Sequence, residues 1–158
     1  EFVSQSLSRH FPNDEERPPM PHYIPSWEGH RSELFKKYPI QMTSTHPKRR
    51  SHSQFDNIPW LREVDPQVIW LNTKDAVARG IKDGDLVKVF NERGEVIVQA
   101  KVTERIMPGV ADLPEGAWYN PDKTGVDHGG CANVLTIDRR SPGGAFTSNS
   151  CLVQVAKA

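Results

Sequence analysis

The stretch LVKVFNERGEVIVQAKVT, residues 86–103, gives the clearest indication of the fold. Apolar and polar residues alternate along Leu86–Phe90 and again along Glu95–Thr103, which is the period of half-buried β-strands. Residues 91–94 between them are typical of a tight turn, with Gly94 expected at its left-handed position. The stretch therefore predicts an antiparallel β-hairpin.

Further short strands are expected on both sides of this hairpin, at residues 39–45, 67–71, 110–113 and 152–155. One helix is well marked between them, because Asn72 or Thr73 can cap its start and Gly80 can follow its end. About six short strands separated by turn signals predict a small β-barrel or sandwich.

The first 38 residues differ from the rest in being polar and rich in proline. Proline lacks the N–H that helices and sheets need, so we expect residues 1–38 to form an extended arm that follows a preceding domain. Short helical segments are expected at residues 2–11 and 32–37. Tyr23 and Trp27 are expected to pack on the main body or on a neighbouring domain, and residues 39–158 to form the barrel domain.

Length and composition exclude several classes of protein. The 158 residues fit one domain, and 20 basic against 20 acidic residues argue against a nucleic-acid-binding module. No apolar run approaches the roughly 20 residues of a membrane-spanning helix, and no signal peptide is recognisable. Because the chain lacks an initiator Met, we expect it to be a piece of a longer protein. Cys131 and Cys151 are expected to be small buried residues rather than a redox pair.

The polar loop at residues 45–54 is the first candidate for chemistry. Lys48, Arg49 and Arg50 could bind an anion such as phosphate together with nearby hydroxyl groups, although a solvated basic turn is the alternative. His46 and His52 are possible metal ligands, but no third histidine, cysteine or carboxylate lies at ligand spacing in the sequence. No metal site is therefore expected.

The second candidate is the stretch from residue 114 to residue 133. Gly129 and Gly130 would allow a ligand to approach the backbone closely, and Trp118 and Tyr119 could stack on a flat heterocycle. Asn133 offers both a donor and an acceptor. An ordinary surface loop with one core aromatic is the alternative. Nucleotide-binding motifs such as G-x-G-x-x-G are not found.

Five sequence blocks, taken in order, resemble one known family. They are THPKRRSHSQ at 45–54, NxxDAxxRGIxDGDxVxVxNxRG at 72–94, VTxxIxPGV at 102–110, EGAWY at 115–119 and GGCANVLT at 129–136. The set resembles the C-terminal molybdopterin-dinucleotide-binding domain of the dimethyl sulfoxide reductase family, and within it the catalytic A chains of the anaerobic enzymes. The resemblance extends from about residue 38 to residue 155.

This resemblance implies a mainly β fold: a six-stranded double-psi β-barrel with one or two short helices and long connecting loops. It also implies a domain that covers molybdenum bis(molybdopterin guanine dinucleotide) and holds its pterin and phosphate groups. The residues expected by position to bind the cofactor are Thr45, His46, Arg50, His52, Ser53 and Gln54 in the first loop, and Glu115, Trp118, Asn133 and Thr136 in the second region. Neither a catalytic nor a metal-ligating residue is expected in this chain.

For the full-length parent, the resemblance implies reduction of S-oxides or N-oxides, such as dimethyl sulfoxide, in anaerobic respiration. The metal ligand and an iron–sulfur cluster are expected in the missing N-terminal part, so this chain alone is expected to be inactive. Expected partners are the remaining domains, an iron–sulfur electron-transfer subunit and a membrane-anchor subunit; nucleic acid and direct membrane insertion are not expected. The parent is expected to be exported and membrane-associated on the extracytoplasmic side, with the cytoplasm as the alternative.

Two other functions remain open from the sequence. The same domain occurs in molybdenum or tungsten hydratases and hydroxytransferases, whose cofactor loops would look alike. A freestanding double-psi barrel that binds peptides or proteins is the second alternative. Self-processing decarboxylases with such a barrel are cleaved at a Gly-Ser pair, which this sequence lacks.

Overall fold

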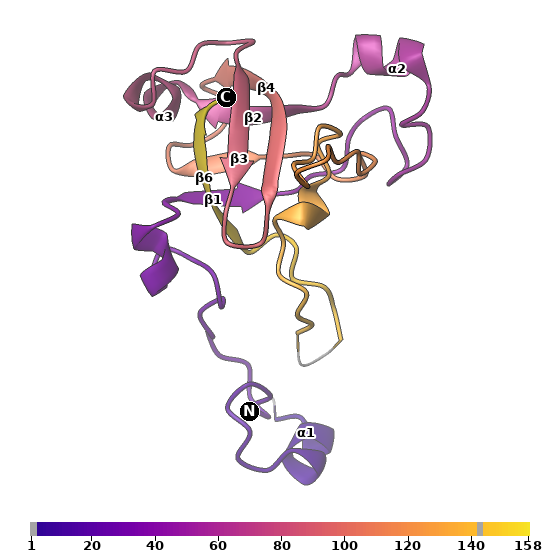
Figure 1. Ribbon diagram of the computed structural model, residues 1–158. Helices are drawn as coiled ribbons and strands as arrows, with labels where there is room; N and C mark the ends of the chain where they lie inside the picture. Colours follow the sequence, from indigo (N-terminus) through magenta and orange to yellow (C-terminus); the bar gives the residue numbers. More distant parts are fainter. Residues whose placement is uncertain (1–2, 142–143) are drawn as a thin grey trace.

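The computed structural model describes residues 3–141 and 144–158 and shows a closed six-stranded β-barrel (Figure 1). The order of strands around the barrel is β1-β5-β2-β4-β3-β6. Their bounds are β1 Ile40–Thr43, β2 Val68–Asn72, β3 Leu86–Phe90, β4 Glu95–Thr103, β5 Val110–Asp112 and β6 Cys151–Lys157. The predicted mainly β, six-stranded barrel is confirmed.

Strands β3 and β4 form the predicted antiparallel hairpin. Val87 lies opposite Val98 and Val89 lies opposite Val96, and all four side chains are buried in the barrel core. The expectation for Gly94 is wrong, because its φ angle is not positive. A Cβ atom at Gly94 would lie 2.6 Å from Cγ1 of Val134, so the glycine makes room for a neighbouring loop instead.

The barrel combines parallel and antiparallel pairing. The pairs β1–β5 and β2–β4 are parallel, and the remaining neighbours are antiparallel. The last strand, β6, closes the barrel between β1 and β3. Inward-facing apolar residues from all six strands form one core, including Ile40, Ile69, Val89, Ala111 and Val153.

The helices are short and lie outside the barrel. In α3 (Thr73–Ala78) the Asn72 side chain accepts a hydrogen bond from the Lys74 N–H at 2.9 Å, and Gly80 follows with a φ of 65°, as predicted. The other helical segments are α1 (Gln5–His10), α2 (Pro59–Val64) and the 3₁₀ turns η1 (Glu33–Lys36) and η2 (Ala132–Val134). Helix α2 was not expected from the sequence. Its large apolar residues Trp60 and Val64 are exposed, so the helix lacks the buried apolar face that a sequence pattern would mark.

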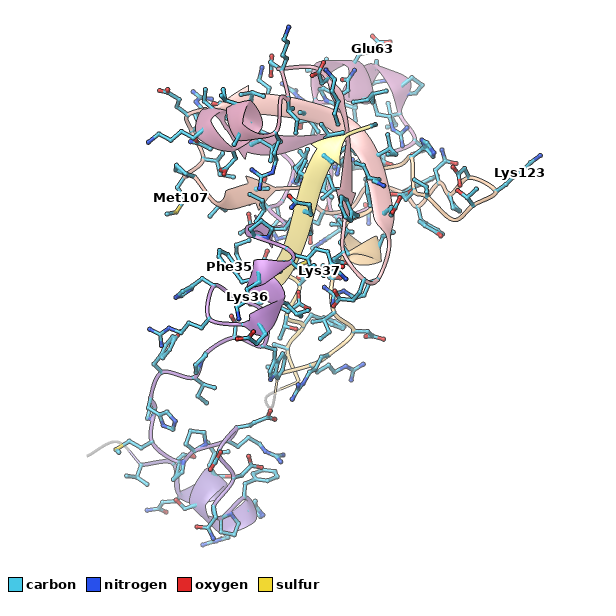
Figure 2. All side chains as sticks on the ribbon, turned by 60° about the vertical axis from the view of Figure 1, so that its left-hand side comes forward. Phe35, Lys36, Lys37, Glu63, Met107 and Lys123 are labelled. Atoms are coloured by element: carbon cyan, nitrogen blue, oxygen red, sulfur yellow. The ribbon has the colours of Figure 1, made fainter. Side chains whose placement is uncertain are left out.

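The N-terminal arm extends away from the barrel, with α1 at its far end (Figure 1). Tyr23 is 69% exposed, so it does not pack on the barrel, and its packing on a neighbouring domain stays a prediction. The Trp27 ring is covered by the Arg139 guanidinium at 3.8 Å. Figure 2 shows η1, with Phe35 and Lys36 labelled, close to the barrel end of the arm. Phe2, at the start of the predicted helix 2–11, lies outside the described residues.

Glu28 fastens the arm to the barrel. Its side chain is buried, and its carboxylate accepts hydrogen bonds from the Leu152 N–H at 2.9 Å and from Arg93 Nη2 at 2.9 Å. Arg93 also donates from Nε to the Leu135 carbonyl at 2.8 Å. The end of the arm, the β3–β4 turn and β6 therefore share one buried polar cluster.

Both cysteines are free thiols, with Cys131 half-buried and Cys151 buried. Burial is the largest effect on Cys151 and raises the pKa of its thiol to about 12. This thiol donates a hydrogen bond to the Leu135 carbonyl at 3.0 Å and stays protonated at neutral pH.

Among the described residues, none of the helices is both long enough and apolar enough to cross a lipid bilayer.

Candidate functional site

The two loops singled out in the sequence lie side by side in the structure. The loop 44–54 follows β1 and the loop 113–120 follows β5, and these strands are parallel neighbours, so both loops leave the same end of the barrel. Asp112 joins them by accepting hydrogen bonds from the Thr45 hydroxyl at 2.7 Å and the Thr45 N–H at 3.0 Å. The Glu115 N–H donates to the Thr45 carbonyl at 3.0 Å.

Three ionisable side chains meet where these loops touch. One oxygen of Glu115, Oε1, lies 2.8 Å from Nδ1 of His46 and 2.7 Å from Nδ1 of His52. The two imidazole rings are 5.1 Å apart between centroids and inclined by 75°. Glu115 thus stands beside the two histidines as a third potential ligand, which ligand spacing in the sequence does not reveal because this residue comes from a distant part of the chain.

The backbone around these side chains is tightly constrained. His52 has a φ of 52°, in the left-handed region, within a turn closed by a hydrogen bond from the Gln54 N–H to the Ser51 carbonyl at 3.0 Å. Gly116 has a φ of 84°, and a Cβ atom there would lie 1.9 Å from the His52 carbonyl oxygen. Only glycine permits this close approach of the two loops.

Arg50 does not face solvent as an available anion-binding group. Its side chain is 8% exposed and donates to Asp56 at 2.6 Å, to Gln67 Oε1 at 2.6 Å and to the Glu115 carbonyl at 3.2 Å. A contact between Arg50 and the cofactor stays a prediction. In the structure this guanidinium links the two loops through its hydrogen bonds. The neighbouring Lys48 and Arg49 are exposed.

Asp56 is the buried anion that balances Arg50. Its carboxylate also accepts from Arg62 Nη2 at 2.6 Å and from the Trp118 N–H at 2.9 Å. Burial alone would raise the pKa of this carboxyl, but the Trp118 N–H and the two guanidinium groups outweigh it and hold the pKa below its usual value. Asp56 therefore stays charged at neutral pH and fixes the loop that carries the histidines.

The loop 127–133 packs against the same region through its glycines. A Cβ atom at Gly129 would lie 1.8 Å from the Trp118 carbonyl oxygen, and one at Gly130 would lie 2.4 Å from Cγ of Gln67. These glycines therefore allow loops to pack on one another, which differs from the expected approach of a ligand.

Asp127 and Gln67 organise these loops, and neither was expected from the sequence. The buried Asp127 carboxylate accepts four backbone N–H bonds, at 2.7–3.0 Å. Gln67 donates to the Pro114 carbonyl at 2.7 Å and the Gly130 carbonyl at 2.9 Å. Both act only through contacts that are distant in the sequence or made to the backbone, so no local pattern marks them.

The remaining candidate residues lie on the same side of the barrel. Trp118 is about half exposed, and its indole N–H donates to the Ser53 carbonyl at 2.7 Å. Asn133 and Thr136 line a cavity of about 470 Å³ together with Glu115. Phe146, an exposed aromatic that the sequence interpretation did not single out, also lines this cavity.

A second cavity, of about 410 Å³, is lined by Thr45, His46, Lys48 and Arg50 among others. His46 lines this cavity and Glu115 lines the other, so their hydrogen bond links the walls of the two cavities. Six of the ten candidate residues therefore line these two cavities, and His52, Ser53 and Trp118 join them through the hydrogen bonds described above.

The donor groups of this region suit a pterin dinucleotide. Exposed imidazoles of His46 and His52 and the amide of Asn133 can bond the polar edges of a bicyclic ring. Lys48 and Arg49 offer positive charge for phosphate groups. The chemistry of the donor set thus fits the cofactor that the resemblance implies.

Comparison with known proteins gives a matching family and several relatives. The family described as "Molydopterin dinucleotide binding domain" matches residues 40–151. The dimethyl sulfoxide reductase DmsA of Escherichia coli K12 is 50% identical over 140 residues, which cover 88% of this chain and 17% of that protein. The trimethylamine-N-oxide reductase 1 of the same strain is 42% identical over 132 residues, covering 77% of this chain and 16% of that protein.

A relative with a different printed activity is the pyrogallol hydroxytransferase large subunit of Pelobacter acidigallici. It is 39% identical over 178 residues, covering 99% of this chain and 20% of that protein. Among solved structures, the acetylene hydratase from Pelobacter acetylenicus matches all of this chain and 23% of its own, with a TM-score of 0.81 and 19% identity, which supports the fold. The chain thus spans less than a quarter of the length of each of these proteins.

Proposed function

Because the chain belongs to the molydopterin dinucleotide binding domain family, we propose that it holds the pterin and phosphate groups of molybdenum bis(molybdopterin guanine dinucleotide) in a larger oxidoreductase. The observation that carries this proposal is the gathering of the candidate residues from two distant loops around His46, His52 and Glu115. The barrel keeps these loops in place, as a binding site requires.

Each group of residues has a role in this proposal. The first loop contributes Thr45, His46, Arg50, His52, Ser53 and Gln54, and the second region contributes Glu115, Trp118, Asn133 and Thr136. Imidazole and amide groups bond the pterin edges, the hydroxyl groups and the exposed Lys48 and Arg49 bond phosphate, and Arg50 contributes by joining the two loops. The Trp118 ring, held by its bond to Ser53, covers one side of the site. When bound, the cofactor supplies the two-electron redox chemistry.

We further propose that the parent protein reduces an S-oxide or an N-oxide. In that reaction the oxide accepts two electrons and two protons and releases the reduced compound and water. The relatives named as dimethyl sulfoxide reductase and trimethylamine-N-oxide reductase support this class of substrate. An iron–sulfur cluster, an electron-transfer subunit, a membrane-anchor subunit and an extracytoplasmic location belong to the same proposal.

A panel of substrates tests this reaction. The purified parent is expected to oxidise a reduced viologen dye when dimethyl sulfoxide or trimethylamine N-oxide is present as the electron acceptor. The present chain alone is expected to show no turnover. Dye oxidation is followed by absorbance. Turnover by the isolated chain, or lack of dye oxidation by a parent that carries its full molybdenum content, would contradict the proposal.

The pyrogallol hydroxytransferase relative supports a second candidate, a hydroxyl transfer between phenols. The same panel separates the two, because the hydroxyl transfer consumes no reduced dye. A parent that converts pyrogallol and leaves the dye reduced with both oxides would favour this second candidate.

A further inference from the structure

We propose that His46, His52 and Glu115 form a binding site for a divalent transition-metal ion of the zinc type in the chain that carries no pterin cofactor. The ligand atoms come from one short loop and one side chain of the neighbouring loop, and they all lie within 4.8 Å of one another. The proposal goes beyond the proposed function, because it concerns a metal ion held by protein side chains alone.

The distances in the cluster are close to those of a metal site. The Glu115 oxygen is 2.8 Å from one ring nitrogen and 2.7 Å from the other, as hydrogen-bonded groups are. Zinc bonds of about 2.0–2.1 Å in tetrahedral geometry separate neighbouring ligand atoms by roughly 3.3 Å. An outward shift of about half an ångström by the Glu115 carboxylate, with rotation of the two imidazoles to bring their nitrogens to the same separation, would therefore admit the ion. The histidine side chains are 73% and 72% exposed, so they can adjust without disturbing the core.

The backbone already holds the three residues in place. His52 occupies a left-handed position in the turn 51–54, a conformation that is costly for residues other than glycine and is often found at functional sites. The close approach of Gly116 to the His52 carbonyl fixes the second loop against this turn. Arg50 adds a hydrogen bond to the Glu115 carbonyl at 3.2 Å. Metal binding would thus require only side-chain adjustments.

The ligand set indicates which ions the site would prefer. Two imidazoles and one carboxylate, with a fourth position open to water, form a set that zinc uses in proteins. Imidazole ligands favour zinc, cobalt, nickel or copper over magnesium and calcium, which prefer oxygen. The nearby Arg50 charge is compensated by Asp56 at 2.6 Å, which reduces its repulsion of a cation.

The metal ion and the cofactor would exclude one another, since both would use the same imidazoles. Metal binding is measured on the isolated chain, whereas cofactor binding is measured on the parent. Either idea can therefore fail while the other holds.

The test is a titration of the tag-free chain with Co²⁺ and Zn²⁺. We expect one ion per chain, with Co²⁺ giving visible absorption bands and Zn²⁺ binding followed by calorimetry. The variants His46→Ala, His52→Asn and Glu115→Gln are each expected to weaken metal binding by at least about tenfold. Removing a group that only hydrogen-bonds to a metal ligand already weakens metal affinity by about 10–100-fold, and these variants remove a ligand itself. Asparagine is chosen at position 52 because it tolerates the left-handed conformation.

His128 provides a matched control, because its Nε2 lies 3.2 Å from Asp122 in a pair of one imidazole and one carboxylate. The His128→Ala variant is expected to bind both metals as the unaltered chain does. Thermal melting of every variant distinguishes a lost site from a lost fold. The proposal is overturned if folded His46→Ala and His52→Asn variants keep full affinity, if His128→Ala weakens binding equally, or if the unaltered chain binds neither metal.

Discussion

Glu28→Ala is expected to lower the free energy of unfolding by about 3–5 kcal/mol, the usual cost of removing one partner from a buried ion pair. The substitution removes the buried carboxylate partner of the Arg93 guanidinium, which keeps only the more exposed Glu92 at 3.3 Å, and leaves the Leu152 N–H without its acceptor. Glu28 is 2% exposed, so water cannot replace these bonds. Urea unfolding followed by circular dichroism measures the change.

Glu33→Ala is the matched control for Glu28. Glu33 pairs with Lys36 at 2.6 Å, but their side chains are 88% and 78% exposed, and exposed pairs contribute about 0–1 kcal/mol. We expect the control to unfold within about 1 kcal/mol of the unaltered chain. Equal, small losses for both variants would show that Glu28 does not fasten the arm to the barrel.

Asp127→Ala is expected to destabilise the chain by an amount comparable to Glu28→Ala. Oδ1 accepts from the N–H groups of Asn120 and Gly129, and Oδ2 accepts from those of Gly130 and Cys131. Each buried donor left without a partner costs about 1–3 kcal/mol. Only the Gly130 bond is fully buried, and water can partly replace the other three. The expected loss is therefore at the lower end of the four-bond sum, about 3–5 kcal/mol, with faster hydrogen exchange along residues 120–131.

The Asp127→Asn variant separates these bonds from the packing of the side chain. The asparagine amide keeps one acceptor oxygen, so we expect this variant to lose only about half as much free energy of unfolding as Asp127→Ala. The control is Asp122→Ala, because Asp122 also accepts backbone bonds in a loop but is exposed. We expect the control to alter local exchange near Lys123, at the tip of the loop in Figure 2, with little effect on global unfolding. If Asp127→Ala unfolds like the control, Asp127 does not organise the loops.

Much of the barrel could be predicted because its strands carry their own pattern. The hairpin of β3 and β4 alternates strictly, and the Asn72 cap and Gly80 mark α3 at both ends. Gly94 was wrongly interpreted because a glycine can serve either a positive φ or a close contact, and here Val134 decides between the two. Helix α2 escaped prediction because its apolar residues face solvent.

The candidate site was only partly predictable, for a different reason. The histidines could be seen in one loop, but Glu115 joins them from 63 residues beyond His52, so spacing in the sequence could not identify the cluster. Likewise, the Arg50 guanidinium is hydrogen-bonded to Asp56 and Gln67, and no sequence motif predicts these contacts. Local chemistry was readable from the sequence, whereas the partners of each group depend on how distant loops pack.

The most direct test of the central claim is the cofactor content of the parent enzyme. The double variant His46→Ala/Asn133→Ala removes two exposed candidate side chains, each lost hydrogen bond being worth roughly 1 kcal/mol. Molybdenum by mass spectrometry and guanine nucleotide released by acid are measured per polypeptide, with His128→Ala/Asn57→Ala as the control. We predict a severalfold loss of both in the double variant and none in the control. Full molybdenum and guanine content in the folded double variant would contradict the claim that this domain holds the cofactor through these loops.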